Sequence, residues 1–232
     1  MKDIKDILFI IQARLASERV PNKMLKPFAG SNLFEIAINK ILSSKIIPKE
    51  NFYLSIYEDK LKKIANKYNL NIYSRSFESA HNDNDLKIIY EWHNKLNFKY
   101  VIKINACSPF LKIETIDSFV KKFISQSKES LFGVIKTNDY YWNEAGSLIT
   151  EWPESQTIMN TKAVGITYKA AHTLYASRMD LIKNNMFMGD FQKPGDISIF
   201  SMDEMECFDI DYEWQFNLGE NLWEIKKKNN EI

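Results

Sequence analysis

Residues 7–26 read ILFIIQARLASERVPNKMLK, and this stretch decides how the rest of the chain is interpreted. It opens with five consecutive apolar residues, a short run without alternation that is typical of a strand buried on both faces of a parallel sheet. The polar loop that follows carries four cations in thirteen residues and a single acid: Arg14, Arg19, Lys23 and Lys26, with Glu18. Open α/β sheets bind ligands at the carboxyl ends of their strands, so the loop predicts a polyphosphate site. On charge alone, a solvated basic loop is an equal alternative.

Strand and helix patterns alternate about five times over the first 135 residues. We expect strands at 7–11, 52–57, 71–74, 100–104 and 130–135. Helices with one apolar face are expected between them, at 33–44, 59–68, 85–94 and 113–124. This alternation is typical of a mostly parallel sheet with helices on both faces.

The pattern changes after residue 136. Residues 137–160 are rich in aromatic and polar side chains and predict an extended or hairpin excursion. The remaining elements are expected as a strand at 161–171, a helix at 176–184, a strand at 197–202 and a helix at 212–228. We therefore expect an α/β, Rossmann-like three-layer sandwich in three parts: a nucleotide-binding core (1–136), a substrate, dimerisation or lid excursion (137–195) and a C-terminal strand and helix that complete the core (196–232).

Composition excludes several classes of protein. The chain has 232 residues, 45% of them hydrophobic, and a net charge of +1, which argues against a nucleic-acid binder that relies on bulk charge. Cys107 and Cys207 lack the spacing of a zinc site and are expected to be reduced core residues. The apolar run near the N-terminus is too short for a signal peptide or a membrane span. We therefore expect a cytoplasmic protein that binds no membrane.

A pair of carboxylates near the C-terminus forms the second informative feature. In the segment CFDID at 207–211, Asp209 and Asp211 are two residues apart, so on a strand they project to the same side. Two such carboxylates suit Mg²⁺, which prefers oxygen ligands and commonly shares them with phosphates. For Asp211 alone, capping the helix expected at 212–228 is the stronger reading. Together with the basic loop, the pair predicts a metal-triphosphate site.

Four stretches in chain order carry a resemblance to a known family: QARLASERVPNK at 12–23, Arg75, NACSP at 105–109 and DID at 209–211. They resemble the motifs of the acylneuraminate cytidylyltransferase family, which includes CMP-sialic acid and CMP-Kdo synthetases and spore-coat polysaccharide relatives. The chain departs from the family pattern where Ala16 replaces a loop glycine, Asn105 a glutamine and Cys107 a threonine.

The resemblance implies a transferase of surface polysaccharide or glycan biosynthesis. It would transfer CMP from CTP to a hydroxyl of an acidic sugar or similar small anionic acceptor, release pyrophosphate, and act as a homodimer. Its catalytic residues would be Arg14, Lys23 and Asp211. The nucleotide would be held by Ala13, Arg14, Ser17, Arg19, Lys23, Arg75, Asn105, Ala106 and Ser108. Mg²⁺ would be bound by Asp209 and Asp211.

Three residues are weaker candidates for acceptor binding. His172 lies in the sugar-side region, although a structural role is equally consistent with a lone histidine. Tyr141 belongs to an aromatic triplet that suits a sugar-stacking wall or a dimer surface. Gln192 could reach an acidic substrate, with a solvated loop as the favoured alternative.

Two other functions stay open at this point. The fold also suits a nucleotidyltransferase that uses another nucleoside triphosphate and a sugar phosphate. A catalytically idle relative that binds nucleotide as a partner subunit is the second possibility, and Ala16 and Asn105 motivate it.

Overall fold

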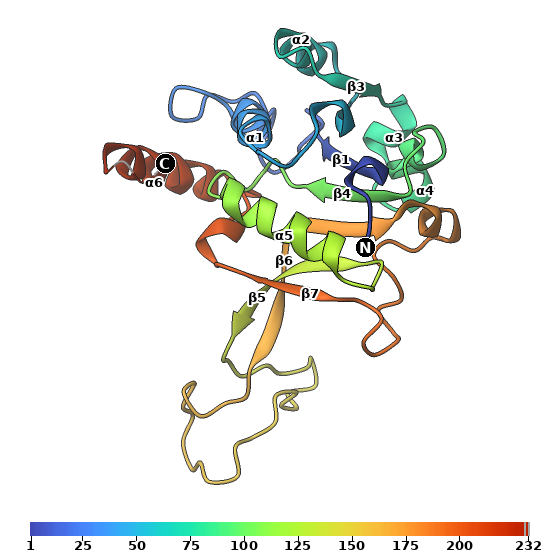
Figure 1. The fold of residues 1–232 in the computed structure, drawn as a ribbon. Coiled ribbons are helices and arrows are strands. Elements are labelled where there is room, and N and C mark those ends of the chain that lie inside the picture. Colours follow the sequence, from blue (N-terminus) through green and yellow to red (C-terminus); the bar gives the residue numbers. More distant parts are fainter. Residues whose placement is uncertain (230, 232) are drawn as a thin grey trace.

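The computed structural model describes residues 1–229 and 231, which fold around a seven-stranded sheet of order β3-β2-β1-β4-β6-β5-β7 (Figure 1). The strands are β1 (Ile7–Gln12), β2 (Phe52–Ile56), β3 (Asn71–Ser74), β4 (Tyr100–Ile104), β5 (Leu131–Thr137), β6 (Thr167–Arg178) and β7 (Ile199–Met202). Neighbouring strands are parallel except where β6 runs antiparallel between β4 and β5. The predicted α/β class with a mostly parallel sheet is confirmed.

β1 lies near the middle of the sheet and is buried on both faces, as its apolar run predicts. Ile7, Phe9 and Ile11 pack into the larger core, whereas Leu8 and Ile10 pack into a second core on the opposite face. All five side chains are fully buried. Two covered faces require an unbroken apolar run, because alternate side chains of a strand point to opposite sides.

Helices cover both faces of the sheet and complete three layers. The larger core packs residues of α1, α2, α5 and α6 against one face, and the smaller core packs residues around α4 and two 3-10 helices against the other. The helices are α1 (Leu33–Leu42), α2 (Asp59–Lys67), α3 (Phe77–His81), α4 (Leu86–Ile89), α5 (Ile113–Ser125) and α6 (Glu213–Lys228). Among the described residues, no helix has the length and apolarity that crossing a membrane requires.

Three predicted elements differ in the structure. The helix expected at 85–94 divides into α4 and a 3-10 helix, Glu91–Asn94. The strand expected at 161–171 begins later, at Thr167, and extends to Arg178. The helix expected at 176–184 is therefore wrong: Ala176 and Ser177 pair with β4, and a 3-10 helix follows at Met179–Asn184. Pairing with distant strands overrides local propensity there.

The excursion leaves the sheet between β5 and β6. Residues 138–166 extend away from the α/β core as a long irregular segment below the sheet in Figure 1. Within it, an isolated bridge joins Trp142 and Leu148, and Tyr140 packs against Trp152 with ring centroids 5.5 Å apart. β6 then returns to the sheet, and the division of the chain at residues 136 and 195 stays a prediction.

The strand order places the loop after β1 and the loop after β4 side by side. β1 pairs with β2 on one side and with β4 on the other, so the order of the strands reverses at β1. The crevice beside the carboxyl end of β1 is therefore a topological switch point. The loop after β1 and the loop after β4 both begin at this crevice. The segment before α6 joins them there, since Ile210 N donates to Cys107 O at 3.0 Å.

Candidate active site

The loop after β1 is fixed by two buried side chains and by turns of its own backbone. Val20 and Met24 are buried in the larger core. Asn22 adopts a left-handed conformation with φ 56°, which asparagine tolerates better than most residues, and its carbonyl accepts bonds from two following amides. Glu58, at the start of α2, accepts a bond from Leu15 N at 2.6 Å. These anchors present the loop's cations to the crevice.

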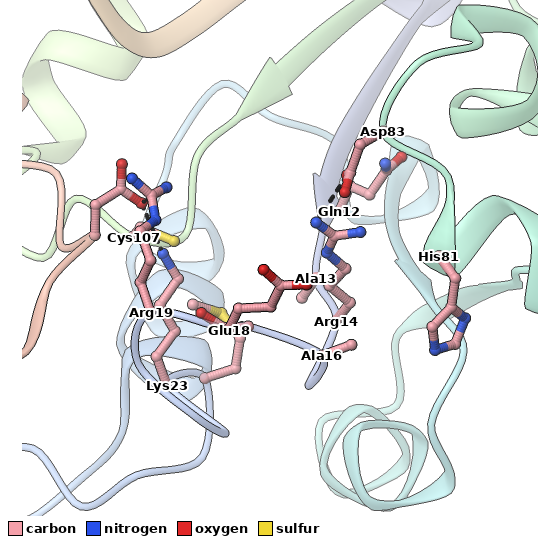
Figure 2. Close-up of a pocket in the computed structure, with 13 residues that line it drawn as sticks. Gln12, Ala13, Arg14, Ala16, Glu18, Arg19, Lys23, His81, Asp83 and Cys107 are labelled. Atoms are coloured by element: carbon pink, nitrogen blue, oxygen red, sulfur yellow. Dashed lines mark hydrogen bonds and ion pairs between the residues drawn. The ribbon is translucent and has the colours of Figure 1, made fainter.

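A cavity of about 610 Å³ lies against this loop. Its two walls are seen in Figure 2, where Arg14 and Asp83 lie on one side and Arg19 and Lys23 on the other. The lining residues come from β1, its loop, the segment after α3, the loop after β4 and the segment before α6: Gln12, Ala13, Arg14, Ala16, Ser17, Glu18, Arg19, Lys23, Met24, His81, Asp83, Cys107 and Asp211. The structure thus brings to one cavity four of the residues that the resemblance assigns to nucleotide binding in the basic loop: Arg14, Ser17, Arg19 and Lys23.

Each cation of the cavity has an acidic partner. Arg14 Nη2 lies 2.8 Å from Asp83 Oδ1, and Arg14 Nη1 donates to Ala80 O at 3.1 Å. Arg19 Nη2 lies 3.0 Å from Asp211 Oδ1, with the guanidinium over the Tyr212 ring. The Arg14 and Arg19 pairs are partly exposed, so solvent screens both of them and each can yield to a phosphate.

Lys23 is the most enclosed cation of the cavity. Its Nζ donates to Ile210 O at 2.7 Å and to Asp211 Oδ1 at 3.1 Å, and its side chain is only 14% exposed. Burial alone lowers the pKa of Lys23, but Cys107, Asp211 and Asp209 together outweigh burial and raise it. Lys23 is therefore a permanent positive charge at the bottom of the site.

Asp209 and Asp211 lie close enough to interact, but residues 208–211 form no strand, in contrast to the strand that the spacing argument assumes. Burial, and then the charge of Asp211, raises the pKa of Asp209. Asn105 Nδ2 lies 3.4 Å from Asp209 Oδ1, while Asp211 binds the two cations described above. Asp211 is not the N-cap of α6, because the helix is capped at Tyr212, and Gln215 Oε1 accepts from the amides of both residues.

A smaller cavity of about 210 Å³ adjoins the first and shares Gln12, Ala13 and Arg14 with it. Arg75 and Lys103 also line it. Arg75 is buried, donates to Ser79 Oγ at 3.0 Å and also bonds Ser79 O. Burial, and then the nearby charge of Arg14, lowers the pKa of Arg75 to about 10. Arg75 thus lies next to the basic loop. In the sequence, only the resemblance to the family indicates that Arg75 belongs to this site.

The other predicted residues divide into two groups. His172 is exposed beside the acid pair, and its carbonyl accepts from Asn105 Nδ2 at 3.0 Å. Ala106 and Ser108 are buried at 4% and 2% exposure, so their side chains face the interior. Tyr141 lies in the excursion, where its hydroxyl bonds Thr137 Oγ1, and Gln192 lies in an exposed loop. Of the predicted site residues, seven line neither of the two cavities: Asn105, Ala106, Ser108, Tyr141, His172, Gln192 and Asp209.

Asp83 and Glu58 were not predicted as site residues. Asp83 stands in the polar run 82–85, whose sequence reads as a helix cap, so nothing local indicates that it pairs with Arg14. Glu58 could have been found, because it follows β2 at the same edge of the sheet as the basic loop.

A basic loop and a carboxylate pair that meet at the switch point of a parallel sheet are features of α/β nucleotidyltransferases. A family model described as Cytidylyltransferase matches residues 8–229, almost the whole chain. The chain therefore belongs to the cytidylyltransferase family, and the resemblance in its motifs is confirmed.

Two relatives and one solved structure illustrate this membership. The chain is 26% identical over 132 residues to the spore coat polysaccharide biosynthesis protein SpsF of Bacillus subtilis, covering 54% of this chain and 53% of that protein. It is 28% identical over 127 residues to 3-deoxy-manno-octulosonate cytidylyltransferase of Francisella tularensis, covering 53% of this chain and 48% of that protein. The chain thus aligns with about half the length of these relatives.

The solved structure is a CMP:2-keto-3-deoxy-manno-octonic acid synthetase complexed with CTP. It superposes with a TM-score of 0.67 at 11% identity, covering 95% of this chain and 99% of that one. At this identity the likeness concerns the fold alone.

Proposed function

We propose that this protein transfers CMP from CTP to a hydroxyl of an acidic sugar, or of a similar small anionic acceptor, and releases pyrophosphate. The observation that carries the proposal is the cavity in which Arg14, Arg19 and Lys23 converge beside Asp211. Three converging cations can neutralise the negative charge of a triphosphate. The acid pair would bind a metal ion next to the phosphates. Family membership supports the same activity.

In the proposed reaction, the acceptor hydroxyl oxygen forms a bond to the α-phosphorus of CTP. The bond from that phosphorus to the oxygen bridging to the β-phosphorus breaks, its electrons leave with pyrophosphate, and the hydroxyl loses its proton. Such a displacement depends on positioning and on neutralising charge more than on covalent help from the protein. Arg14 and Arg19 would exchange their acidic partners for phosphate oxygens, and Ser17 would add a hydroxyl donor. Lys23 would stabilise the charge that gathers on pyrophosphate.

Asp209 and Asp211 fit a hard divalent cation, and we propose Mg²⁺. Among the described residues, no group of three or more His, Cys, Asp or Glu side chains could hold a metal, so phosphate oxygens would complete the ligand set. Burial, and then the like charge of Asp211, raises the pKa of Asp209. A bound cation would stabilise the ionised form of Asp209 against both effects. When bound, Mg²⁺ would neutralise phosphate charge and lower the pKa of the attacking hydroxyl.

The nucleoside would occupy the side of the site formed by Ala13, Arg75 and the loop after β4. Arg75 supports this placement because it lines the smaller cavity next to the basic loop. Asn105 would contribute its amide, whereas Ala106 and Ser108 would contribute backbone groups, since their side chains are buried. Of the acceptor candidates, His172 has the strongest support because it lies beside Asn105.

A cytoplasmic homodimer remains part of the proposal. The excursion and the start of β6 expose a set of large apolar side chains that would be covered by a second copy of the chain: Tyr141, Trp142, Ile149, Trp152, Ile158, Met159, Ile166 and Tyr168. Exposed apolar surface of this kind is typical of protein interfaces. Tyr141 and Gln192 would meet an acceptor only if such an assembly completes the site.

Calorimetric titration with CTP in the presence of Mg²⁺ tests the proposal without knowledge of the acceptor. Lys23→Met should weaken CTP binding about tenfold or more, because a charge-assisted contact with phosphate is lost. Lys26→Met is the matched control, since Lys26 belongs to the same loop but pairs with Glu213 and does not line the cavity. No binding of CTP by the wild-type protein, or equal losses in the two variants, would contradict the proposal.

A further inference from the structure

The loop after β4 is held from behind by a lysine of α1. Lys40 Nζ donates to Pro109 O at 2.7 Å and lies 3.4 Å from Ser108 O. Lys40 lines neither of the two cavities of the candidate active site. Burial lowers the pKa of Lys40 to about 7, although the charge of Glu206 opposes this change. Enclosing an ammonium is unfavourable, so a purely packing role would be served better by an apolar side chain.

Glu206 holds the same loop further along. It is buried at 5% exposure, and its Oε2 accepts from Lys112 N at 3.2 Å. Its Oε1 also lies 3.8 Å from Lys112 Nζ. Glu206 belongs to the 3-10 helix Met205–Cys207, which leads directly into the segment that carries Asp209. Lys40 and Glu206 thus fix residues 108–112 from two separate elements.

The near end of this loop contacts the acid pair directly. Cys107 O accepts from Ile210 N at 3.0 Å, and Cys107 N donates to Asn105 Oδ1 at 2.9 Å. The side-chain amide nitrogen of Asn105, Nδ2, lies 3.4 Å from Asp209 Oδ1. A shift of residues 108–112 would therefore move groups that touch Asp209.

Packing fixes the outer side of the loop only in part. A cavity of about 690 Å³ lies beside it, against α1 and α6, and Lys40, Pro109 and Lys112 line this cavity. Phe110 and Leu111 are its buried apolar anchors, and the Phe110 ring lies 5.8 Å from that of Phe208 and 5.9 Å from that of Trp223. Hydrogen bonds from Lys40 and Glu206 act together with these apolar contacts and fix the backbone groups that packing does not reach.

We propose that Lys40 and Glu206 are positioning residues that hold the loop 105–112 so that Asn105 and Asp209 are placed to receive the metal-bound nucleotide. Neither residue lines the two cavities of the candidate active site. The inference rests on the proposed function, since it takes Asp209 as a metal ligand. Residues that orient the ligands of a metal commonly change its affinity by about 10- to 100-fold when they are replaced.

The test measures CTP affinity of the full chain by calorimetry, once with Mg²⁺ and once with EDTA. Lys40→Met removes the ammonium and keeps much of the side-chain volume. We expect it to weaken CTP binding about tenfold with Mg²⁺ and by less than about twofold with EDTA. Lys122→Met is the matched control, because Lys122 Nζ also donates to a carbonyl, Ile199 O at 3.0 Å, at a site that lines neither active-site cavity.

Glu206→Gln keeps an acceptor for the Lys112 amide and removes the charge, so it tests the inference even if Lys40→Met does not fold. It should weaken CTP binding with Mg²⁺ in the same direction, by about threefold. Losses that are equal with Mg²⁺ and with EDTA, or Mg²⁺-dependent affinities like those of the wild type, would overturn the inference. Failure of the wild-type protein to bind CTP at all would instead contradict the proposed function.

Discussion

Lys40 also makes a prediction about stability that needs no substrate. Burial lowers its pKa from 10.5 to about 7 in the folded protein, whereas the unfolded chain keeps the ordinary value. Between these two pH values the unfolded chain binds more protons at this residue than the folded protein does. The contribution of Lys40 to the free energy of unfolding therefore rises as pH increases from 7 toward 10.5.

The size of this effect follows from the two pKa values. From pH 7 to pH 9, the wild-type protein should gain about 2 kcal/mol of unfolding free energy relative to Lys40→Met, which has no group to titrate. Urea denaturation followed by tryptophan fluorescence at pH 7, 8 and 9 measures the difference between the two proteins. Titration of the other groups is common to both and cancels, as does the pH-independent loss of the bonds to Ser108 O and Pro109 O.

A stability difference that stays constant from pH 7 to pH 9 would refute this reasoning, because it would mean that Lys40 titrates as an exposed lysine. A difference that decreases with pH would reverse the sign of the effect and refute it as well.

Three further predictions concern the site itself. Asp209→Asn should raise the free energy of unfolding at neutral pH without Mg²⁺, because burial and then Asp211 raise the pKa of Asp209 and so make its ionised form destabilising. Urea denaturation measures this effect. The same variant should abolish the enhancement of CTP binding by Mg²⁺, which calorimetry measures. Asp211→Ala should abolish Mg²⁺-dependent pyrophosphate release with little change in circular dichroism, and full activity would disprove its assignment as a metal ligand. Asp83→Asn should tighten CTP binding about threefold, since the exposed Asp83 competes with phosphate for Arg14, and weaker binding would count against that competition.

The features that the sequence predicts best are those that depend on short, local patterns. Five apolar residues in a row identify β1 because only a strand covered on both faces needs them. Asp209 and Asp211 both lie near Lys23, although their segment is not the strand on which the two-residue spacing argument depends. The carboxyl edge of the sheet then explains why the basic loop and the acid pair meet, although they are almost 200 residues apart.

Features that depend on distant partners could not be predicted in this way. Residues 176–178 have a sequence compatible with a helix, but pairing with β4 keeps them in β6. Arg14 finds Asp83 across the crevice, and Lys40 finds carbonyls of a loop more than sixty residues away. Ser108 carries a motif position of the family yet turns its side chain inward, which only the packing around it reveals.

The central claim is that the basic cavity and the acid pair together transfer CMP from CTP. The most direct measurement incubates the protein with Mg²⁺, one nucleoside triphosphate at a time and a panel of acidic sugars and sugar phosphates, and records pyrophosphate and product masses. We expect CTP to be preferred over UTP, GTP and ATP, and a product to appear with the mass of an acidic acceptor joined to CMP. Preference for another nucleotide, or products formed only from sugar phosphates, would contradict it.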